Sequence, residues 1–443
     1  MRTLQYILLL FSLLFLISCS DNNIEQFFDG GNGTEANPYQ ISTVEQLQAI
    51  GEEENLDKHF IQVADIDASP SQEFQNGSGW RQIGFRETPF TGSYNGNGYV
   101  IRDLKLHAQR GGPSNGVWGY MKNGRIENVV IDNSVQLSTE SMDKQYQVVS
   151  YDQSLDFLTQ ASAVLDLSEA DGYGGMVGFN DGGEIINCIF HGRVDARMGA
   201  PAGFVGINTG LVENSHFKGT TGGFSGIGFT AINMGKIVDS STEIRVSGMG
   251  AVGFASINYG EIIRSSAHVD LFGSSGATGF VSHNWGGRIE SSYVTGEVRG
   301  YIRVAAFSVE NSGIIKNSYS NVDVSITKDP HNDFFDASGF VFENSEEGLI
   351  ENSYATGSLR SIDGEAELAT VINENRGLVN SLYWDMDALG NHPDVLNGSN
   401  DGTKGLSTAE MTGPAAEQSM PGFDWVNVWG TTAEGYPVLR WEE

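Results

Sequence analysis

One asparagine recurs through most of this chain at a nearly constant spacing. Successive copies are 28, 25, 25, 26, 27, 33 and 31 residues apart and stand at Asn180, Asn208, Asn233, Asn258, Asn284, Asn311, Asn344 and Asn375. A short apolar stretch with small residues precedes nearly every copy, and a glycine, an aliphatic residue and a polar-Ser pair follow it. A fixed period in this range is the signature of a repeat architecture. The sequence therefore predicts a solenoid, which grows by stacking similar units.

Aligning the repeats on the polar-Ser pair gives two columns of aliphatic residues. The first column stands two residues before the pair and comprises Ile126, Ile185, Val212, Ile237, Ile262, Ile289, Ile315, Ile350 and Leu378. The second lies further along each repeat and comprises Val194, Val246, Leu271, Val298, Val324 and Leu359. Such columns, stacked at the parallel-strand spacing of roughly 4.8 Å, build a continuous narrow core. We expect an all-β fold, a right-handed parallel β-helix of roughly 25-residue rungs, each with three short strands.

The recurring asparagine suits the turns of such a coil. Turns recur at the same place in every rung, and an amide can donate to one neighbour and accept from the next. We therefore predict a buried asparagine ladder with a structural role. Cys188 stands where other repeats carry serine, which indicates a small buried thiol.

The first residues have the features of a secretory signal. Arg2 is followed by an apolar run from Ile7 to Ile17, which is too short for an ordinary membrane span. The segment Leu16-Ile17-Ser18-Cys19 resembles the bacterial lipobox. That resemblance implies a signal peptide over 1–18 and lipidation of Cys19. Serine rather than aspartate at position 20 favours an outer-membrane lipoprotein, facing the periplasm or the cell surface.

The rest of the chain divides around the repeats. A flexible tether is expected over 19–36 and an N-terminal cap with the first rungs over 37–115, where Ser42 and Glu45 form a capping box and strands cover 60–66 and 99–106. The repeats occupy 116–384, interrupted by an insertion at 136–171, where we expect a short helix or a folded-over loop, and by a smaller one at 327–337. A C-terminal cap is expected over 385–443, with a second capping box at Ser407 and Glu410 and an apolar cover. That cover consists of Trp425, Trp429, Tyr436, Leu439 and Trp441.

Several of these segments match a known pattern. Gly175-Met176-Val177-Gly178 before Asn180, and Gly203-Phe204-Val205-Gly206 before Asn208, resemble the GLUG motif of bacterial surface proteins. The leader around Asn37-Pro38-Tyr39 and the close at Gly435-Tyr436-Pro437 are similar to the same proteins. The resemblance implies a filamentous-haemagglutinin-like right-handed parallel β-helix, as found in adhesins, stalks and lipoproteins. It implies no catalytic residues.

Charge and motifs exclude several function classes. The formal net charge of −31 leaves no basic stripe to neutralise phosphates, so no nucleic-acid partner is expected. The charge also disfavours a long polyanionic ligand. The sequence carries no established catalytic or zinc-binding signature. Asp65 and Asp67 are weak candidates for a metal site, and calcium is the one cofactor left open.

One departure from the repeat pattern marks a candidate face. Four residues after the polar member of the pair, where the usual residue is threonine, four successive repeats carry His191, Lys218, Glu243 and His268. Two residues further on, the neighbouring column includes Arg193, Arg245 and Asp270. Alternation with the apolar column places both sets on the outer face of one strand. Opposite-charge pairing on a solvated face explains much of this pattern, and ligand binding or general acid–base chemistry are the alternatives.

These features predict a lipid-anchored cell-envelope β-helix that functions in adhesion or carbohydrate binding. Its expected partners are a polysaccharide or a cell-surface glycan or protein, and it contacts the membrane through its lipid alone. A polysaccharide lyase or glycoside hydrolase acting from the His191–His268 face is the second hypothesis. A structural spacer is the third.

Overall fold

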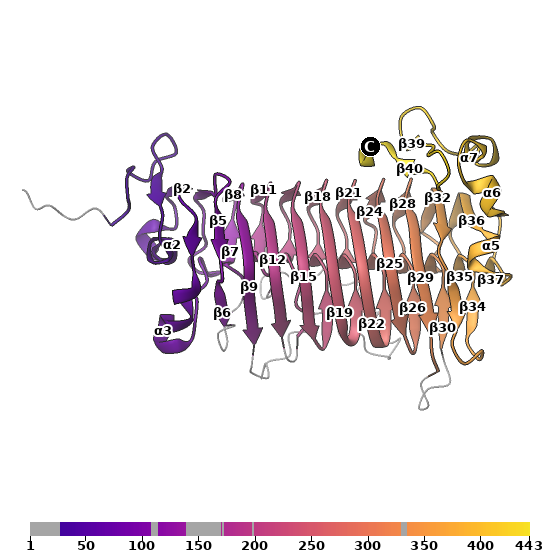
Figure 1. Cartoon of the computed structure of the whole chain (residues 1–443), viewed down its shortest axis with the longest axis horizontal. Coiled ribbons are helices and arrows are strands. Elements are labelled where there is room, and N and C mark those ends of the chain that lie inside the picture. The colour runs from indigo at the N-terminus through magenta and orange to yellow at the C-terminus, as the bar shows by residue number, and fades with distance from the viewer. Residues whose placement is uncertain (1–26, 108–113, 139–169, 171, 197–198, 329–334) are drawn as a thin grey trace, which may run out of the picture.

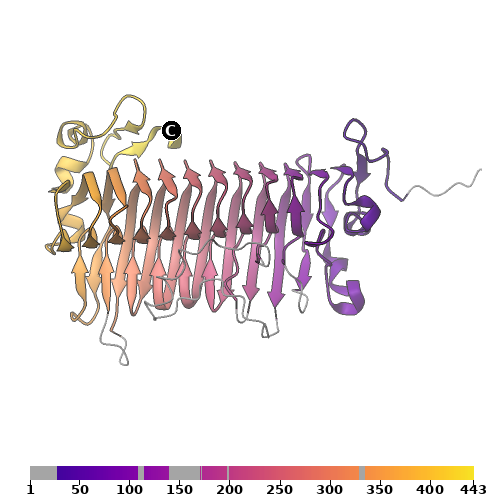
Figure 2. The same cartoon turned by 180° about the vertical axis from the view of Figure 1, so that it is seen from behind.

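The computed structural model describes residues 27–107, 114–138, 170, 172–196, 199–328 and 335–443, and the predicted parallel β-helix is confirmed (Figure 1). Strands form a 28-stranded sheet and a ten-stranded sheet, and a small two-stranded sheet lies near the C-terminus. Every pairing within the two large sheets is parallel, with neighbouring rungs side by side, as the view from behind also shows (Figure 2). Regular stacking of this kind follows from repeats that bury the same positions on each turn.

A single rung shows the path of the chain. It runs through β13 (Val205–Asn208), β14 (Leu211–Glu213), β15 (His216–Gly223) and β16 (Ser225–Ile227) before the next rung begins at β17 (Thr230–Asn233). This rung therefore has four strands rather than the three expected. The fourth is short, and in the following rungs it merges with the third into the long strands β19 (Ser241–Val252) and β22 (Ser266–Thr278).

The other strands repeat these positions. The ten-stranded sheet also contains β7 (Trp118–Lys122), β10 (Val177–Asp181), β20 (Ala255–Asn258), β23 (Val281–Asn284), β27 (Ser308–Asn311), β31 (Val341–Asn344), β35 (Ile372–Asn375) and β37 (Val395–Gly398). The second position of the rung is taken by β8 (Arg125–Glu127), β11 (Glu184–Ile186), β18 (Lys236–Val238), β21 (Glu261–Ile263), β24 (Arg288–Glu290), β28 (Ile314–Lys316), β32 (Leu349–Thr356) and β36 (Leu378–Asp385). The third and fourth positions are taken by β9 (Val130–Ser138), β12 (Ile189–Ala196), β25 (Tyr293–Gly300), β26 (Arg303–Ala305), β29 (Tyr319–Ile326), β30 (Asp336–Ser338), β33 (Leu359–Ser361) and β34 (Glu367–Ala369). One further strand, β38 (Thr403–Leu406), pairs with β36.

The buried asparagine ladder is present as predicted. Each Nδ2 donates to the Oδ1 of the next copy at 2.8 or 2.9 Å, from Asn180 through Asn375. The same amides also donate to carbonyl oxygens near the turn, as Asn258 does to Gly260 at 3.2 Å. The ladder begins at Asn180 because the residue below it in register is Met121, which offers no amide.

A serine ladder accompanies it and explains the polar-Ser pair. The polar member has a left-handed backbone, with φ of 55° at Asn187, 46° at Asn214 and 51° at Asp239. Among residues other than glycine, asparagine and aspartate adopt this conformation most readily. The serine Oγ then accepts the backbone N–H of the rung before, as Ser240 does from Ser215 at 3.2 Å. The turn at the left-handed residue of each rung is thus held by the serine of the next rung.

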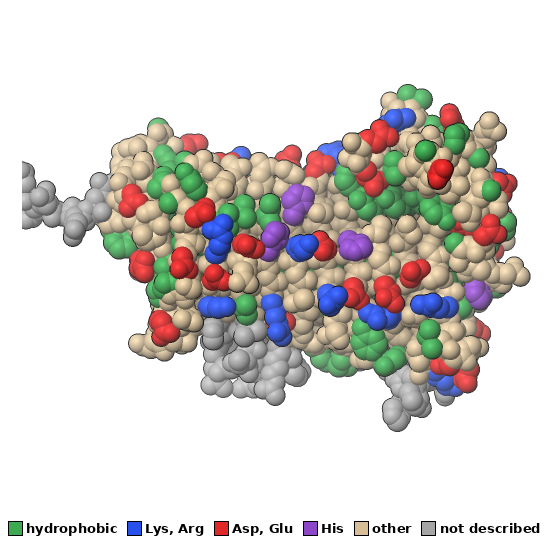
Figure 3. All heavy atoms as spheres, in the orientation of Figure 1, with side chains coloured by type: hydrophobic (Ala, Val, Ile, Leu, Met, Phe, Trp, Pro, Cys, Tyr) green, Lys and Arg blue, Asp and Glu red, His purple; other side chains and the backbone are tan. Residues whose placement is uncertain are grey.

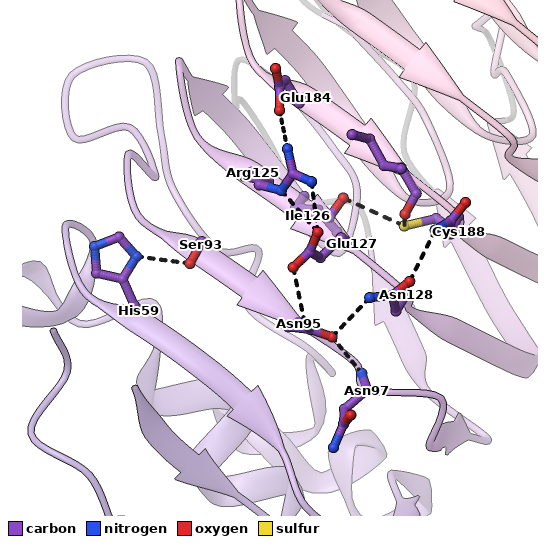
Figure 4. A network of polar contacts seen from close by, with 12 residues as sticks. His59, Ser93, Asn95, Asn97, Arg125, Ile126, Glu127, Asn128, Glu184 and Cys188 are labelled. Carbon is purple, nitrogen blue, oxygen red and sulfur yellow. Dashed lines mark hydrogen bonds and ion pairs between the residues drawn. The ribbon is translucent and has the colours of Figure 1, made fainter. Parts of the chain in front are cut away.

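Cys188 occupies the first position of this serine ladder. It is fully buried, as predicted, and its Sγ lies 3.2 Å from the carbonyl oxygen of Ile186 and 3.7 Å from that of Ile126 (Figure 4). Burial raises the pKa of the thiol to about 12. The buried position and the suppressed thiolate make Cys188 a packing residue.

The aliphatic columns are confirmed with one exception. Ile185, Val212 and Ile237 stack in register and are fully buried, but Leu378 is 68% exposed and Val379 takes its place in the core. The prediction failed at Leu378 because the alignment slipped by one residue. Ser381, with φ of 60°, takes the left-handed position that Asn352 holds in the rung before.

Phenylalanines fill the remainder of the interior. Consecutive rings stack with centroids 4.8 to 5.0 Å apart along Phe204, Phe229, Phe254, Phe280, Phe307 and Phe340. Ring contacts at about the rung spacing add to the packing between successive rungs.

The N-terminal region differs in detail from prediction. The helix α2 (Val44–Ala49) is capped by Thr43 and Gln46, one residue after the predicted pair Ser42 and Glu45. The oxygen Oε1 of Gln46 accepts hydrogen bonds from the N–H groups of Ser42 and Thr43 at 2.8 and 3.2 Å. Gln46 rather than Glu45 therefore closes the capping box.

Each long strand expected in this region is divided into two. The observed strands are β1 (Tyr39–Ile41), β2 (His59–Gln62), β3 (Ile66–Asp67), β4 (Ser93–Asn95), β5 (Val100–Arg102) and β6 (Lys105–His107), with η1 (Glu53–Asn55), η2 (Ser69–Glu73) and α3 (Phe74–Gly77) between them. Residues 27–36, expected within the tether, are folded here, because Phe28 is buried and stacks on Tyr39 at 4.5 Å. Most of the insertion at 136–171 and part of the one at 327–337 lie outside the described residues, although residues 136–138 belong to β9.

The C-terminal segment folds back along the side of the last rungs (Figure 1). After α5 (Met386–Leu389) and β38, it forms α6 (Thr408–Met411), α7 (Ala415–Ser419), β39 (Trp429–Gly430), β40 (Val438–Leu439) and η4 (Arg440–Glu442). The predicted capping box is present, with the N–H of Ser407 donating to Glu410 at 2.9 Å. The segment packs its aromatic residues on Tyr319, Tyr354 and Tyr383.

Candidate functional site

The four ionisable residues predicted to share a column do so. His191, Lys218, Glu243 and His268 pair in register on β12, β15, β19 and β22, and Thr295 of β25 follows. A row of charged and histidine side chains runs along one face of the molecule (Figure 3). The alternation of buried and outward residues along each strand places the four residues outside the core.

Within this column the charged groups contact one another. Lys218 Nζ lies 2.7 Å from Glu243 Oε2, and both side chains are more than half exposed. His268 Nδ1 lies 2.9 Å from the hydroxyl of Thr295, and His191 Nδ1 lies 3.4 Å from Asp132. Exposed pairs of this kind contribute about 1 kcal/mol or less to stability. The opposite-charge pairing anticipated from the sequence is therefore part of the site.

The neighbouring column forms a separate group of ion pairs. Arg245 Nε lies 2.8 Å from Asp270 Oδ2, and Arg299 Nη2 lies 2.5 Å from the other oxygen of Asp270. Arg193 pairs with Asp195 on its own strand at 2.5 Å. None of Arg193, Arg245 and Asp270 lines the hollow described next, so the predicted set divides into two parts.

A hollow of about 430 Å³ lies beside the first column. All four residues of that column line it, together with Thr295, Ile189, His216, Ser241, Ser266 and Tyr293 from the next outward column and the buried Phe217, Thr242 and Ala267. The hollow exists because Ser241 and Ser266 are small, whereas His216 precedes them and Tyr293 follows them in register. Two rungs thus lack a bulky side chain between two that have one.

The C-terminal segment ends next to this hollow. The indole of Trp441 stacks on Tyr293 with centroids 5.7 Å apart, and its Nε1 donates to the carbonyl oxygen of Ser291 at 2.8 Å. Glu442 accepts a hydrogen bond from the hydroxyl of Tyr319 at 3.0 Å. The hollow is therefore the uncovered continuation of the surface that the C-terminal segment covers on later rungs.

Burial shifts the pKa of three groups around the hollow. It lowers the pKa of His216, with a smaller contribution from His191, so this imidazole is neutral at pH 7. It raises the pKa of Glu442 and of Tyr293, whose hydroxyl interacts with both Ser266 and Glu442. His216 also contacts the hydroxyl of Ser241 through Nδ1 at 2.8 Å. The inner wall of the hollow therefore combines uncharged polar groups with the apolar side chains of Ile189, Phe217 and Ala267, and Glu442 lies outside this lining.

Sequence reasoning did not identify this inner wall. His216, Ser241, Ser266 and Tyr293 each follow the ladder serine directly, so the repeat register contained the signal. Tyr293 is an ordinary residue of the repeat at this position, as are Tyr319 and Tyr354. Those two are buried under the C-terminal segment, in agreement with a structural role.

Asp65 and Asp67 use their carboxylates within the protein. Asp65 accepts from the N–H of Val100 and from Arg102, both at 2.9 Å, and Asp67 accepts from the N–H of Ser69 at 2.9 Å. Among the described residues, no group of three or more His, Cys, Asp or Glu side chains is placed to hold a metal ion. Within the same residues, no helix is long and apolar enough to cross a membrane.

Comparisons with known proteins leave the family open, since no family model matches the chain. The chain is 36% identical over 107 residues to halomucin of Haloquadratum walsbyi (strain DSM 16790 / HBSQ001), a match that covers 24% of this chain and 1% of halomucin. It is 31% identical over 124 residues to a "Putative Gly-rich membrane protein" of Evansella cellulosilytica, covering 28% of this chain and 14% of that protein. The matches thus span a small part of these relatives.

One solved structure is similar over nearly the whole chain. It is the crystal structure of a "putative immunoglobulin A1 protease" from Bacteroides ovatus, which is 17% identical with a TM-score of 0.40 and covers 94% of this chain and 96% of its own.

Proposed function

We propose that this protein is a lipid-anchored component of the cell envelope, a GLUG-type repeat protein that binds carbohydrate at the outer membrane or cell surface. The observation that carries the proposal is the hollow beside the His191–His268 column. It combines hydroxyl groups, imidazoles, a Lys218–Glu243 pair and an aromatic ring in a concave surface, the features of a site for a polyhydroxylated ligand. The rigid coil would hold this site away from the membrane, with Cys19 as the lipid-bearing residue.

Binding is tested with immobilised polysaccharides. We expect retention of the purified protein on at least one polysaccharide and weaker retention of Lys218→Ala and His268→Ala. Arg193→Ala is the matched control, because Arg193 lies on the same face but outside the hollow. Absence of retention on every polysaccharide, or equal loss in the control, would refute the proposal. The anchor is tested separately, since Cys19→Ala should release the protein from the membrane fraction.

A polysaccharide lyase or glycoside hydrolase is the second candidate, and Glu442 is the observation that favours it. A half-buried carboxyl group with a raised pKa beside the hollow suits a general acid. The same polysaccharides are therefore examined for new reducing ends or unsaturated products. Products that disappear in Glu442→Gln, or in His191→Ala and His268→Ala, would replace the adhesin proposal with an enzymatic one. If the protein is not retained and no products form, a structural spacer is the remaining function.

A further inference from the structure

The shape of the hollow sets the direction of its ligand. Its lining residues come from five successive rungs, β12, β15, β19, β22 and β25, so it is elongated along the axis of the coil. The two small serines, Ser241 and Ser266, lie between His216 on one side and Tyr293 on the other. A linear chain parallel to the axis would contact one side chain of each rung in turn.

The charges around the hollow favour an uncharged ligand. The ammonium group of Lys218 is 2.7 Å from the carboxylate of Glu243. The lysine that lines the hollow is therefore already paired with a carboxylate and offers less to an acidic ligand. His191 has Asp132 at 3.4 Å, and burial keeps His216 neutral at pH 7. The whole chain has a formal net charge of −31, which repels polyanions at long range. The hydroxyl groups of Ser241, Ser266 and Thr295 remain as neutral hydrogen-bonding groups.

Tyr293 supplies the apolar contact. It is the first ring of a stack that continues through Tyr319 at 4.8 Å and Tyr354 at a further 4.8 Å. Tyr319 and Tyr354 are buried, whereas Tyr293 is half-buried and lines the hollow. Stacking against Tyr319 and Trp441 fixes the ring before any ligand arrives, which lowers the entropic cost of binding.

We propose that the hollow binds a neutral glycan chain laid along the coil axis, with one sugar ring against Tyr293 and sugar hydroxyls on Ser241, Ser266 and Thr295. This proposal rests on the carbohydrate-binding function proposed above and specifies its ligand class and its positioning ring. An acidic glycan is the competing ligand, and the two differ in their dependence on salt.

The test compares neutral and acidic polysaccharides at two ionic strengths. The purified protein is titrated with a β-glucan, a galactomannan, alginate and polygalacturonate in about 50 mM and about 500 mM NaCl, which shortens the screening length about threefold. We expect a neutral polysaccharide to bind with a dissociation constant that changes less than about twofold between the two salt concentrations. Tyr293→Ala should weaken this binding about tenfold, and Tyr293→Phe should preserve most of it.

Two substitutions fill the hollow, and a third serves as control. Ser241→Leu and Ser266→Leu should each abolish binding, whereas Ser247→Leu should not, because Ser247 is exposed on the same β19 strand away from the hollow. Equal thermal midpoints would show that all three variants fold.

The outcomes separate this inference from the proposed function. Binding of acidic polysaccharides alone, lost at high salt, would overturn the neutral-glycan inference and leave carbohydrate binding intact. Binding of a neutral polysaccharide that is unaffected by Tyr293→Ala and Ser266→Leu would overturn the assignment of the hollow. Binding of no polysaccharide would overturn both proposals.

Discussion

The asparagine ladder predicts a difference between its interior and its first member. Asn258 accepts a hydrogen bond from Asn233 at 2.8 Å and donates to Asn284 at 2.8 Å and to the carbonyl oxygen of Gly260 at 3.2 Å. Asn180 makes two donor contacts, to Asn208 at 2.8 Å and to Gly183 at 3.1 Å, and its own Oδ1 receives no donor within the described residues. Replacing each by alanine therefore removes different sets of interactions.

The expected costs follow from these sets. Asn258→Ala removes three hydrogen bonds at about 1 kcal/mol each and leaves Asn284 Oδ1 buried without a donor, which costs a further 1 to 3 kcal/mol or so. The total is about 4 to 6 kcal/mol. Asn180→Ala removes two hydrogen bonds, eliminates one unsatisfied oxygen and leaves Asn208 Oδ1 bonded to the N–H of Gly210, so its cost is about 1 kcal/mol.

Urea unfolding followed by circular dichroism measures both variants against the parent chain. The free energy of unfolding at zero urea should fall several-fold more for Asn258→Ala than for Asn180→Ala. Because both positions lose the same side-chain volume, cavity formation does not account for a difference. Equal losses, or a larger loss for Asn180→Ala, would refute the reasoning that unsatisfied acceptors determine the cost.

Three further predictions concern other parts of the coil. Cys188→Ser should change the free energy of unfolding by less than about 1 kcal/mol, because it extends the serine ladder, and the native thiol should resist thiol reagents until the protein unfolds. Burial lowers the pKa of His283 to about 4 from an ordinary 6.5, so the unfolded state binds the extra proton and stability should fall by up to about 3 kcal/mol as the pH drops from 6.5 towards 4. In His283→Asn this slope should disappear from urea midpoints measured against pH, and a persistent slope would assign it to another group. A double-mutant cycle on Lys218 and Glu243 should give a coupling below about 1 kcal/mol that vanishes in high salt, whereas a larger or salt-independent value would contradict the exposed geometry.

The residues inside the coil can be predicted from the sequence because their positions repeat from rung to rung. Asn208, Val212 and Ser215 each meet the same neighbours one rung away, so periodicity alone identifies them. The one slip, at Leu378, occurred where Ser381 replaced the usual asparagine at the left-handed position and shifted the apparent pair.

The candidate site was only half predictable from sequence. The ionisable column stood out because it departed from the repeat, but Ser241 and Ser266 are ordinary residues whose importance lies in the bulk they lack between His216 and Tyr293. The return of the C-terminal segment over the tyrosines was not encoded in any local pattern. It joins Glu442 to Tyr319 across 123 residues of sequence, a contact that depends on the number of rungs between them.

That return has a consequence for how such a coil changes in length. The hydroxyl of Tyr354 donates to the carbonyl oxygen of Pro437 at 2.8 Å, and Trp441 donates to the carbonyl oxygen of Ser291. Residues of the C-terminal segment thus each contact one particular rung. A rung duplicated among the contacted rungs would move Pro437 and Trp441 out of step with their partners. A rung duplicated before Tyr293 would leave every one of these contacts in place. The coil can therefore gain rungs on the N-terminal side of Tyr293 without disturbing the C-terminal segment, but not among the rungs that this segment covers. The hollow lies at the boundary between these two parts.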